Sequence, residues 1–191
     1  MLPFKNLESA VLSLLPILDD AMDEIVHDND YDQVIDLYKN GLIRICGSSI
    51  KYNDSAVLIC SDEEESYGIR DRFLKDGAKK LSSNHSWIYL NDGSPFILNT
   101  SGNHENDGIA SAPLDFLFYL SDRGKEKEFR ALNRIDKKHI LDLVIQKKVP
   151  RGLRTGLYKM LDTSNSFTYG FGEEYPEQTY KNISGFVDKS I

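Results

Sequence analysis

The sequence predicts an α+β fold, in which N-terminal helices precede a small mixed or antiparallel sheet of about four strands, and a C-terminal helical subregion follows. Three observations favour this class. Apolar residues recur at helical spacing near the amino terminus, short β-branched runs alternate with turn residues over 42–100, and helical patterns return over 111–161. The length of 191 residues suffices for a single domain, 1–191, with one core.

The first region, residues 1–41, is predicted to be helical. Seven apolar side chains between Leu7 and Ile25 recur at spacings of three and four, which predicts a helix over about 6–27 with one apolar face. Pro16 lies inside this helix, where its ring and missing N–H favour a kink. A shorter helix follows and ends at Asn40-Gly41, because glycine readily adopts the left-handed conformation of a helix end.

The sheet is expected over residues 42–100. The runs 42–46 and 55–60 are β-branched and apolar, and SWIYLNDGSPFILNT predicts a hairpin. Ser61 and Glu64 have the spacing of a capping box, so a helix is expected after the second run. This order of strand, helix and strand is typical of a right-handed crossover.

Residues 111–161 are expected to be helical. Pro113 after Ser111 is typical of a first helical turn, and LDFLFYL follows. A second helix is expected over about 122–134, and Asp136 is the predicted cap of the next. The remaining residues, 162–191, contain aromatic residues and glycine without a period, which predicts an irregular tail.

Charge is unevenly distributed along a chain whose net charge is −7. Residues 1–121 contain 9 Lys and Arg against 20 Asp and Glu, net −11. Residues 122–159 contain 12 against 5, net +7, and residues 160–191 contain 2 against 5, net −3. Such asymmetry indicates either a partner of opposite charge or pairing between regions of the same chain.

The basic residues of 122–134 form the most specific pattern. At about 100° per residue, four of them lie within roughly 60° of one another on a helix. They are Arg123, Lys127, Arg130 and Arg134. Three interpretations remain open: a solvated helix face, a site for acidic protein or nucleic-acid phosphate, and docking onto the chain's own acidic half. The net charge disfavours nucleic acid, because non-specific binders usually have a net basic domain.

The acidic residues gather in two groups, for which we predict a role in binding a basic partner. They are Asp28, Asp30, Asp32 and Asp36, and Asp62, Glu63, Glu64 and Glu65. The first group resembles the start of an EF-hand loop, but Gln33 and Lys39 occupy the positions that need glycine and an acid. We therefore expect no metal site and no cofactor.

The expected function is that of a non-enzymatic protein-binding domain whose acidic surface meets a basic partner, by analogy with immunity proteins that neutralise basic toxins. One alternative is a nucleic-acid-associated accessory protein that uses the basic helix. Another is a hydrolase or transferase with a site on the 101–108 loop, which contains His104, and Cys60. Cys46 and Cys60 each close an apolar run and are expected to be free thiols. With no apolar run of about 18 residues and no secretory signal, we expect a cytoplasmic protein that does not bind membranes.

Overall fold

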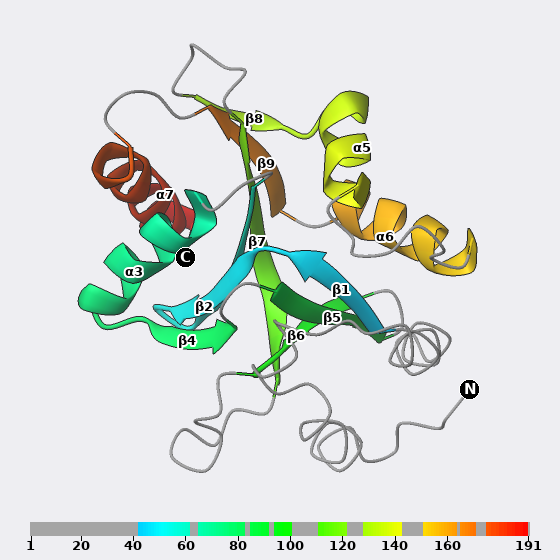
Figure 1. Cartoon of the computed structure of the whole chain (residues 1–191), viewed down its shortest axis with the longest axis horizontal. Coiled ribbons are helices and arrows are strands. Elements are labelled where there is room, and N and C mark those ends of the chain that lie inside the picture. The colour runs from blue at the N-terminus through cyan, green and yellow to red at the C-terminus, as the bar shows by residue number, and fades with distance from the viewer. Residues whose placement is uncertain are drawn as a thin grey trace, which may run out of the picture.

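The computed structural model describes residues 42–61, 65–82, 85–91, 94–100, 111–121, 128–142, 151–163, 165–170 and 175–190. These residues contain nine strands and four helices (Figure 1). In chain order the elements are β1 (Leu42–Cys46), β2 (Ser48–Tyr52), β3 (Ser55–Cys60), α3 (Glu65–Lys75), β4 (Lys79–Ser82), β5 (His85–Asn91), β6 (Ser94–Leu98), β7 (Ser111–Ser121), β8 (Phe129–Ala131), α5 (Arg134–Asp142), α6 (Arg151–Thr163), β9 (Asn165–Gly170) and α7 (Glu177–Ser190).

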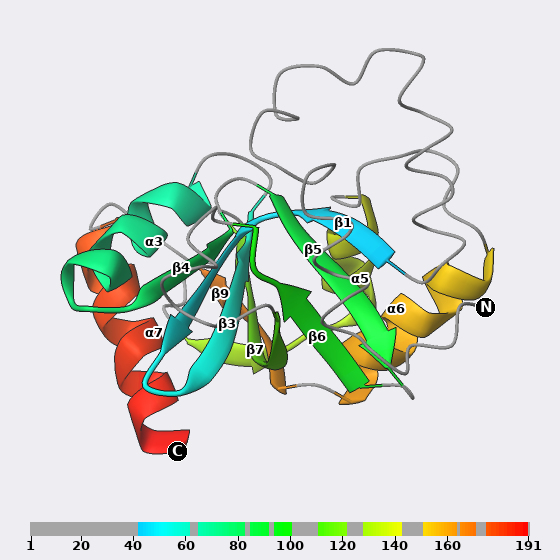
Figure 2. The ribbon, with the colours of Figure 1, turned by 90° about the horizontal axis from the view of Figure 1, so that it is seen from below.

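The prediction of a small sheet of about four strands is wrong, because the nine strands form one mixed sheet that curls into a half-barrel. Its order is β1-β5-β6-β7-β3-β2-β4, with β9 paired to β7 and β8 paired to β9. Helices α3 and α7 pack on one side and α5 and α6 on the other (Figures 1 and 2). The helices predicted within 1–41 lie outside the described residues.

Strand β7 is the largest departure from the predicted secondary structure, because residues 111–121 were expected to form a helix. Its central part is buried on both faces: Phe116 and Phe118 belong to the apolar cluster beneath α3 and α7, and Leu117 and Tyr119 to the cluster beneath α5 and α6. A strand buried on both faces needs a continuous apolar run, and such a run does not distinguish a strand from a buried helix.

Strand β7 also organises the sheet. Its first part pairs with β6 antiparallel, from Leu98↔Ser111 to Phe96↔Pro113. Its second part pairs with β9 parallel, and its other edge pairs with β3 parallel. The carboxyl ends of β3, β7 and β9 therefore lie at one edge of the sheet, which is where parallel sheets commonly place ligands.

The curl of the sheet begins at Gly47, between β1 and β2. Its φ of +152° disfavours an L side chain, and a Cβ there would lie 2.6 Å from the carbonyl oxygen of Ile59. The chain turns at this glycine, so that β1 pairs with β5 while β2 pairs with β3 and β4. Buried hydroxyl groups form hydrogen bonds at this bend. Ser82 Oγ lies 2.7 Å from Ser49 Oγ and 2.6 Å from Ser86 Oγ, and the Ser86 hydroxyl donates to the Gly47 carbonyl.

Several predicted elements are confirmed. The runs 42–46 and 55–60 are β1 and β3, the hairpin is β5–β6, and the helix after Ser61 is α3. The predicted irregular tail is wrong, because residues 162–191 contain the end of α6, β9 and α7. No helix within the described ranges combines the length and apolar character needed to cross a bilayer.

Candidate functional site

The basic stripe expected on a helix over 122–134 is not formed as predicted. Residues 129–131 are strand β8, which pairs antiparallel with β9. Successive side chains of a strand point to opposite faces, and this conformation directs Phe129 into the aromatic cluster. Its ring packs there against Phe118, Phe167 and Phe186 at centroid distances of 5.6, 6.5 and 4.5 Å. Arg123 and Lys127 lie outside the described residues.

The next helix begins only at Arg134, because Asn133 caps it. The Asn133 side-chain oxygen accepts hydrogen bonds from the backbone N–H of Ile135 at 2.7 Å and of Asp136 at 3.0 Å. The Asp136 carboxylate in turn accepts the Asn133 N–H at 3.1 Å. This reciprocal pair is a capping box. Asp136, which we predicted to be the cap, is therefore its partner at the third helical position.

Arg130 and Arg134 are nevertheless both exposed and belong to one side of the molecule. On β8, Phe129 points into the aromatic cluster beneath α7, so Arg130 points to the opposite face of the sheet, the face that α5 and α6 cover. Arg134 is the first residue of α5. Strand β8 thus places Arg130 on the face of the sheet that α5 covers, whereas the prediction had placed it on one face of a helix.

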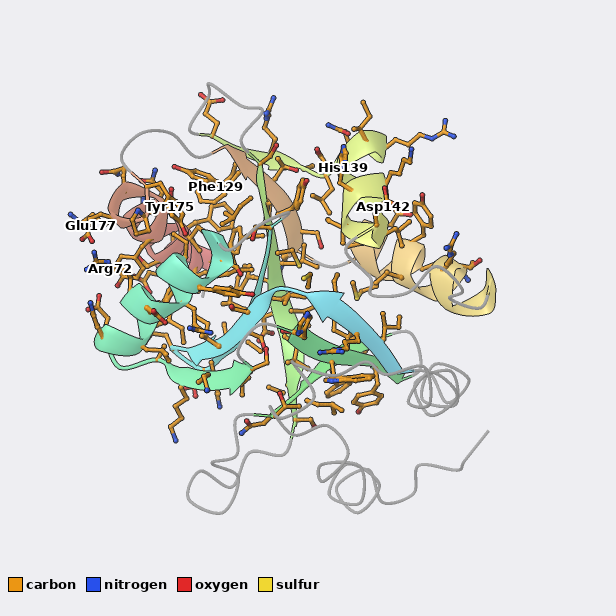
Figure 3. The ribbon with its side chains drawn as sticks, in the orientation of Figure 1. Arg72, Phe129, His139, Asp142, Tyr175 and Glu177 are labelled. Atoms are coloured by element: carbon orange, nitrogen blue, oxygen red, sulfur yellow. The ribbon has the colours of Figure 1, made fainter. Side chains whose placement is uncertain are left out.

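The exposed face of α5 combines basic residues with one large apolar side chain. Ile140 is buried, and Arg134, Ile135 and Lys138 are exposed on the side of the helix that points away from it. The side chain of Ile135 is 62% exposed. Asp142 is the acidic residue of this face, and it lies at the end of α5, beyond His139 (Figure 3).

Helix α6 adds a second exposed apolar side chain. Leu157, Met160 and Leu161 point into the core, whereas Tyr158 is 38% exposed. Asp162, one turn after Tyr158, bonds the ammonium group of Lys137 on α5. The side of α6 that carries Tyr158 therefore faces towards α5, and Arg154, one turn before Tyr158, is exposed on that same side.

We call these six side chains the α5–α6 surface. They are Arg130, Arg134, Ile135, Lys138, Arg154 and Tyr158. Within the described part of the chain, Arg134, Lys138 and Arg154 form no ion pair. Lys137, whose ammonium group bonds Asp162 of α6, lies two residues after Ile135 and therefore on nearly the opposite side of α5. Ile135 thus points away from α6, and the six side chains combine positive charge with two separate exposed apolar residues of the α5–α6 layer.

The opposite side of the molecule differs in its charges. There Arg72 of α3 binds Glu177 of α7 at 3.1 Å, and Lys181 lies 3.7 Å from the same carboxylate (Figure 3). The predicted acidic groups comprise eight residues. Seven of the eight residues lie outside the described ranges, and Glu65 is described only as the first residue of α3.

The residues of the predicted catalytic alternative do not assemble a site within the described chain. Cys60 is a fully buried free thiol, and burial followed by the nearby Cys46 raises its pKa, so the thiol stays protonated. His85 is hydrogen-bonded through Nδ1 to the Arg44 guanidinium at 3.0 Å. His104 and the rest of the 101–108 loop lie outside the described residues. Within those that are described, no group of three His, Cys, Asp or Glu side chains is arranged to hold a metal ion.

The sequence analysis missed the apolar members of the α5–α6 surface. Ile135 and Tyr158 were detectable only as apolar residues that lie off the buried stripe of their helices. Ile135 precedes Ile140 by five residues, and that spacing places the two side chains on nearly opposite sides of a helix. Lys138 and Arg154 were part of the basic region but not of any pattern that singled them out.

No protein-family model matches the chain, and no curated protein matches it. Among solved structures, the Hpr(Ser) kinase/phosphatase from Coxiella burnetii is similar at 8% sequence identity and a TM-score of 0.46, covering 77% of this chain and 97% of that one.

Proposed function

We propose that the protein is a non-enzymatic protein-binding domain whose α5–α6 surface binds an acidic, partly apolar segment of a partner protein. The observation that supports this proposal best concerns Ile135 and Tyr158. They are the large apolar side chains exposed to solvent within the described residues, and both belong to this basic surface. Scattered apolar residues are ordinary on protein surfaces, but these two belong to the helical layer that also carries the four cations, and this favours an interaction there.

The energetics assign different roles to the two kinds of side chain. Complete burial of an Ile side chain contributes about 1.5–3 kcal/mol, and Ile135 has 62% of its surface still to bury. An exposed charge pair adds only about 0.2–1 kcal/mol. Ile135 and Tyr158 would therefore supply most of the affinity. The Arg and Lys side chains would select an acidic partner and accelerate its association.

A protein fits this surface better than a nucleic acid does. An aliphatic side chain such as Ile135 offers no ring on which a base can stack. The remainder of the chain is acidic and repels phosphate beyond the surface itself. The nucleic-acid alternative is therefore the less favoured one, and it becomes an outcome of the experiment below.

A basic partner for the acidic residues is a second proposal, and the sequence between β3 and α3 favours it. A strand–loop–helix unit that binds phosphate at this position needs glycine and a basic residue. Here Asp62, Glu63, Glu64 and Glu65 follow Ser61 instead. Four carboxylates repel phosphate and attract cations. The immunity-type function belongs to this second proposal, as does a cytoplasmic location, with which two free cysteines are compatible.

The first proposal is tested by site-specific photo-cross-linking of the full chain in its native host. Tyr158 is replaced by p-benzoylphenylalanine, and Lys181 on α7, with 60% of its side chain exposed, receives the same replacement as the matched control. We expect a protein adduct from position 158 whose cross-linked peptide is rich in Asp and Glu. The combined substitutions Arg134→Glu and Arg154→Glu should abolish this adduct.

Three outcomes contradict the proposal. One is an adduct that nuclease removes, which would favour the nucleic-acid alternative. Another is an adduct of equal yield from positions 158 and 181. The third is an adduct that survives the two charge reversals, because the cations would then play no part in recognition. The second proposal is tested separately: Glu63→Gln with Glu64→Gln should leave the adduct at position 158 unchanged and weaken capture of a basic partner.

A further inference from the structure

We infer that Thr168, Arg130 and His139 form a binding site for a phosphate group at the carboxyl ends of β7 and β9, beneath α5. The inference goes beyond the proposed function and does not depend on it, because it starts from a side chain that is buried within the fold. It follows from three features: a buried hydroxyl group without a hydrogen-bond partner, the side chains that surround it, and their place in the sheet.

Thr168 carries this hydroxyl group. The residue is 3% exposed, and within the described part of the chain its Oγ1 has no hydrogen-bond partner. At Ser82, by contrast, the buried hydroxyl bonds both Ser49 and Ser86. Buried polar groups usually have a partner, because a group that loses its hydrogen bond to water and gains none costs free energy. The Thr168 hydroxyl therefore indicates a position where a bound molecule supplies the missing hydrogen bond.

Thr168 lies in the middle of a row of side chains that crosses three strands. It pairs with Arg130 on β8 and with Tyr119 on β7. Paired residues of neighbouring strands point to the same face of a sheet, and the strands are about 4.8 Å apart. Arg130 and Tyr119 therefore flank the hydroxyl on the face that α5 and α6 cover. Arg130 is exposed, so movement of this long side chain gives a ligand access to the row.

His139 approaches the row from α5. Its ring stacks on the ring of Tyr119 at a centroid distance of 6.3 Å and an interplanar angle of 9°. Figure 3 shows His139 on the side of α5 that faces the sheet, where the residue is half-buried. Because Thr168 and Tyr119 are on neighbouring strands, the imidazole lies within reach of a group bound beside the Thr168 hydroxyl.

The row lies at a topological switch point of the sheet. Strands β7 and β9 are parallel neighbours, and Tyr119 and Thr168 each stand two residues before the end of their strand. Helices α5 and α6, which follow β7, pack on one face of the sheet, whereas α7, which follows β9, packs on the other. Ligands commonly bind at the carboxyl ends of strands where the connections diverge in this way. The last pair of the two strands, Ser121 and Gly170, adds no bulky side chain at this edge.

The donors of this site suit a phosphate group. A guanidinium group binds phosphate oxygens through two parallel N–H groups, and a hydroxyl and an imidazole N–H each donate one further hydrogen bond. The three donors come from β8, β9 and α5, so they approach from different directions, which matches a tetrahedral anion better than a planar carboxylate. Arg134 and Lys138, on the same helix as His139, add positive charge. The acidic remainder of the chain disfavours a long polyanion, but a single phosphate group does not extend beyond these cations.

A titration followed by NMR tests the site on the full chain with methyl-labelled threonine. Sodium phosphate and phenyl phosphate are added separately at constant ionic strength, with sodium chloride and sodium acetate as reference salts. We expect either phosphate to produce a saturable shift of the Thr168 methyl and His139 ring resonances, and tighter binding of phenyl phosphate would assign the site to a phosphate monoester. The methyl group of Thr179, a buried threonine of α7, is the matched control and should not shift. The absence of a phosphate-specific shift at Thr168 overturns the inference and leaves ordered water as the partner of the hydroxyl, and an equal shift with acetate overturns the assignment to phosphate.

Two variants test the roles of the side chains, with the His139 ring resonances as the readout. Thr168→Val replaces the hydroxyl with a methyl group of similar size, so it should leave the thermal midpoint of unfolding unchanged or raise it. Thr168→Val and Arg130→Gln should each weaken phosphate binding about tenfold, because each removes a hydrogen bond to a charged group. Lys181→Gln, which removes the same charge from the exposed surface of α7, should leave the affinity unchanged. Unchanged affinity in Thr168→Val or in Arg130→Gln overturns the site. The photo-cross-linked adduct at position 158 of the otherwise unchanged chain decides the proposed function separately.

Discussion

The two helical layers of this protein both bury apolar side chains, but they differ in the apolar side chains that they leave exposed. On the α3–α7 side, Phe186 packs within 6.5 Å, centroid to centroid, of four aromatic rings, and Tyr180 packs edge-on against Phe73 at 4.8 Å. The Tyr175 side chain packs closely on α3 there, since a Cβ on Gly68 would lie 2.8 Å from the Tyr175 hydroxyl. On the α5–α6 side, Ile135 and Tyr158 remain exposed.

In our proposal, this difference separates side chains that stabilise the fold from side chains that contact a partner. Aromatic rings at these distances stabilise by burial and by about 0.5–1.5 kcal/mol of additional interaction for each pair. An exposed Ile contributes little to folding, but it gains free energy when a partner covers it. Both layers therefore stabilise the sheet, and in our proposal the exposed Ile135 and Tyr158 of the α5–α6 layer contact a partner.

The largest expected effect is on the α3–α7 layer. Phe186→Ala should lower the free energy of unfolding by about 3 kcal/mol, because it removes a ring from the aromatic cluster and leaves a cavity. Urea denaturation measures the change, with Lys189→Ala at the exposed end of the same helix as the control. A loss below about 1 kcal/mol would mean that α7 does not stabilise the sheet as described.

The elements that could be predicted from the sequence are those whose local pattern of polar and apolar residues matches their burial in the structure. Strands β1 and β3 follow from short β-branched runs, and α3 follows from its start signal at Ser61. Strand β7 could not be identified, because tertiary contacts on both of its faces decide between strand and helix. Helix α7 was missed because Gly185, a poor helix former, interrupts the spacing of three and four between Tyr180, Ile183 and Val187.

The site was predictable only in part, and for a related reason. The charge count located the basic region, and Arg130 and Arg134 are indeed exposed. Their geometry depended on β8, which exists because Phe129 finds partners on β7, β9 and α7. Exposure of Ile135 and Tyr158 is a property of the packed structure, and no local pattern of polar and apolar residues specifies it.

A smaller effect is expected at the bend of the sheet that both layers share. Ser82→Ala should cost about 1–3 kcal/mol of unfolding free energy, since the Ser49 N–H and the Ser49 and Ser86 hydroxyls lose a buried partner. The control is Ser190→Ala at the exposed end of α7. Equal denaturation midpoints for the two variants would show that water replaces the lost hydroxyl without cost.

The pH dependence of stability also distinguishes the layers. Burial, and then the hydrogen bond to Asp76, raise the pKa of Tyr180 to about 12 from 10.0. The folded state favours the protonated phenol. The contribution of Tyr180 to the free energy of unfolding is therefore complete below pH 10 and is lost as the pH rises through about 12. Tyr180→Phe should therefore cost about 1.5 kcal/mol at pH 8 and less at each higher pH. Urea unfolding from pH 8 to 12 measures the difference, and a difference that stays constant would contradict the assignment.

A smaller loss of stability is expected at the start of α5, in the other helical layer. Asn133→Ala removes the acceptor for two backbone N–H groups and should cost about 1 kcal/mol. Asn133→Asp keeps a capping oxygen and should restore most of that loss. Because Arg134 and Ile135 are the next two residues, the alanine variant should also reduce the photo-adduct at position 158, and the aspartate variant should not. If both variants lose the adduct equally, the amide group of Asn133 is needed for the adduct and the cap is not.

The smallest expected change in stability is at Ile135 itself. Ile135→Ser should change the free energy of unfolding by no more than about 0.5 kcal/mol, because the side chain is already 62% exposed. The matched substitution on the other layer, Val187→Ser, should cost several times more, since Val187 is fully buried. The adduct yield should show the reverse order, with a loss of roughly tenfold for Ile135→Ser and little change for a folded Val187→Ser protein. If Ile135→Ser destabilises as strongly as Val187→Ser, then Ile135 is part of the core and the α5–α6 surface loses its apolar anchor.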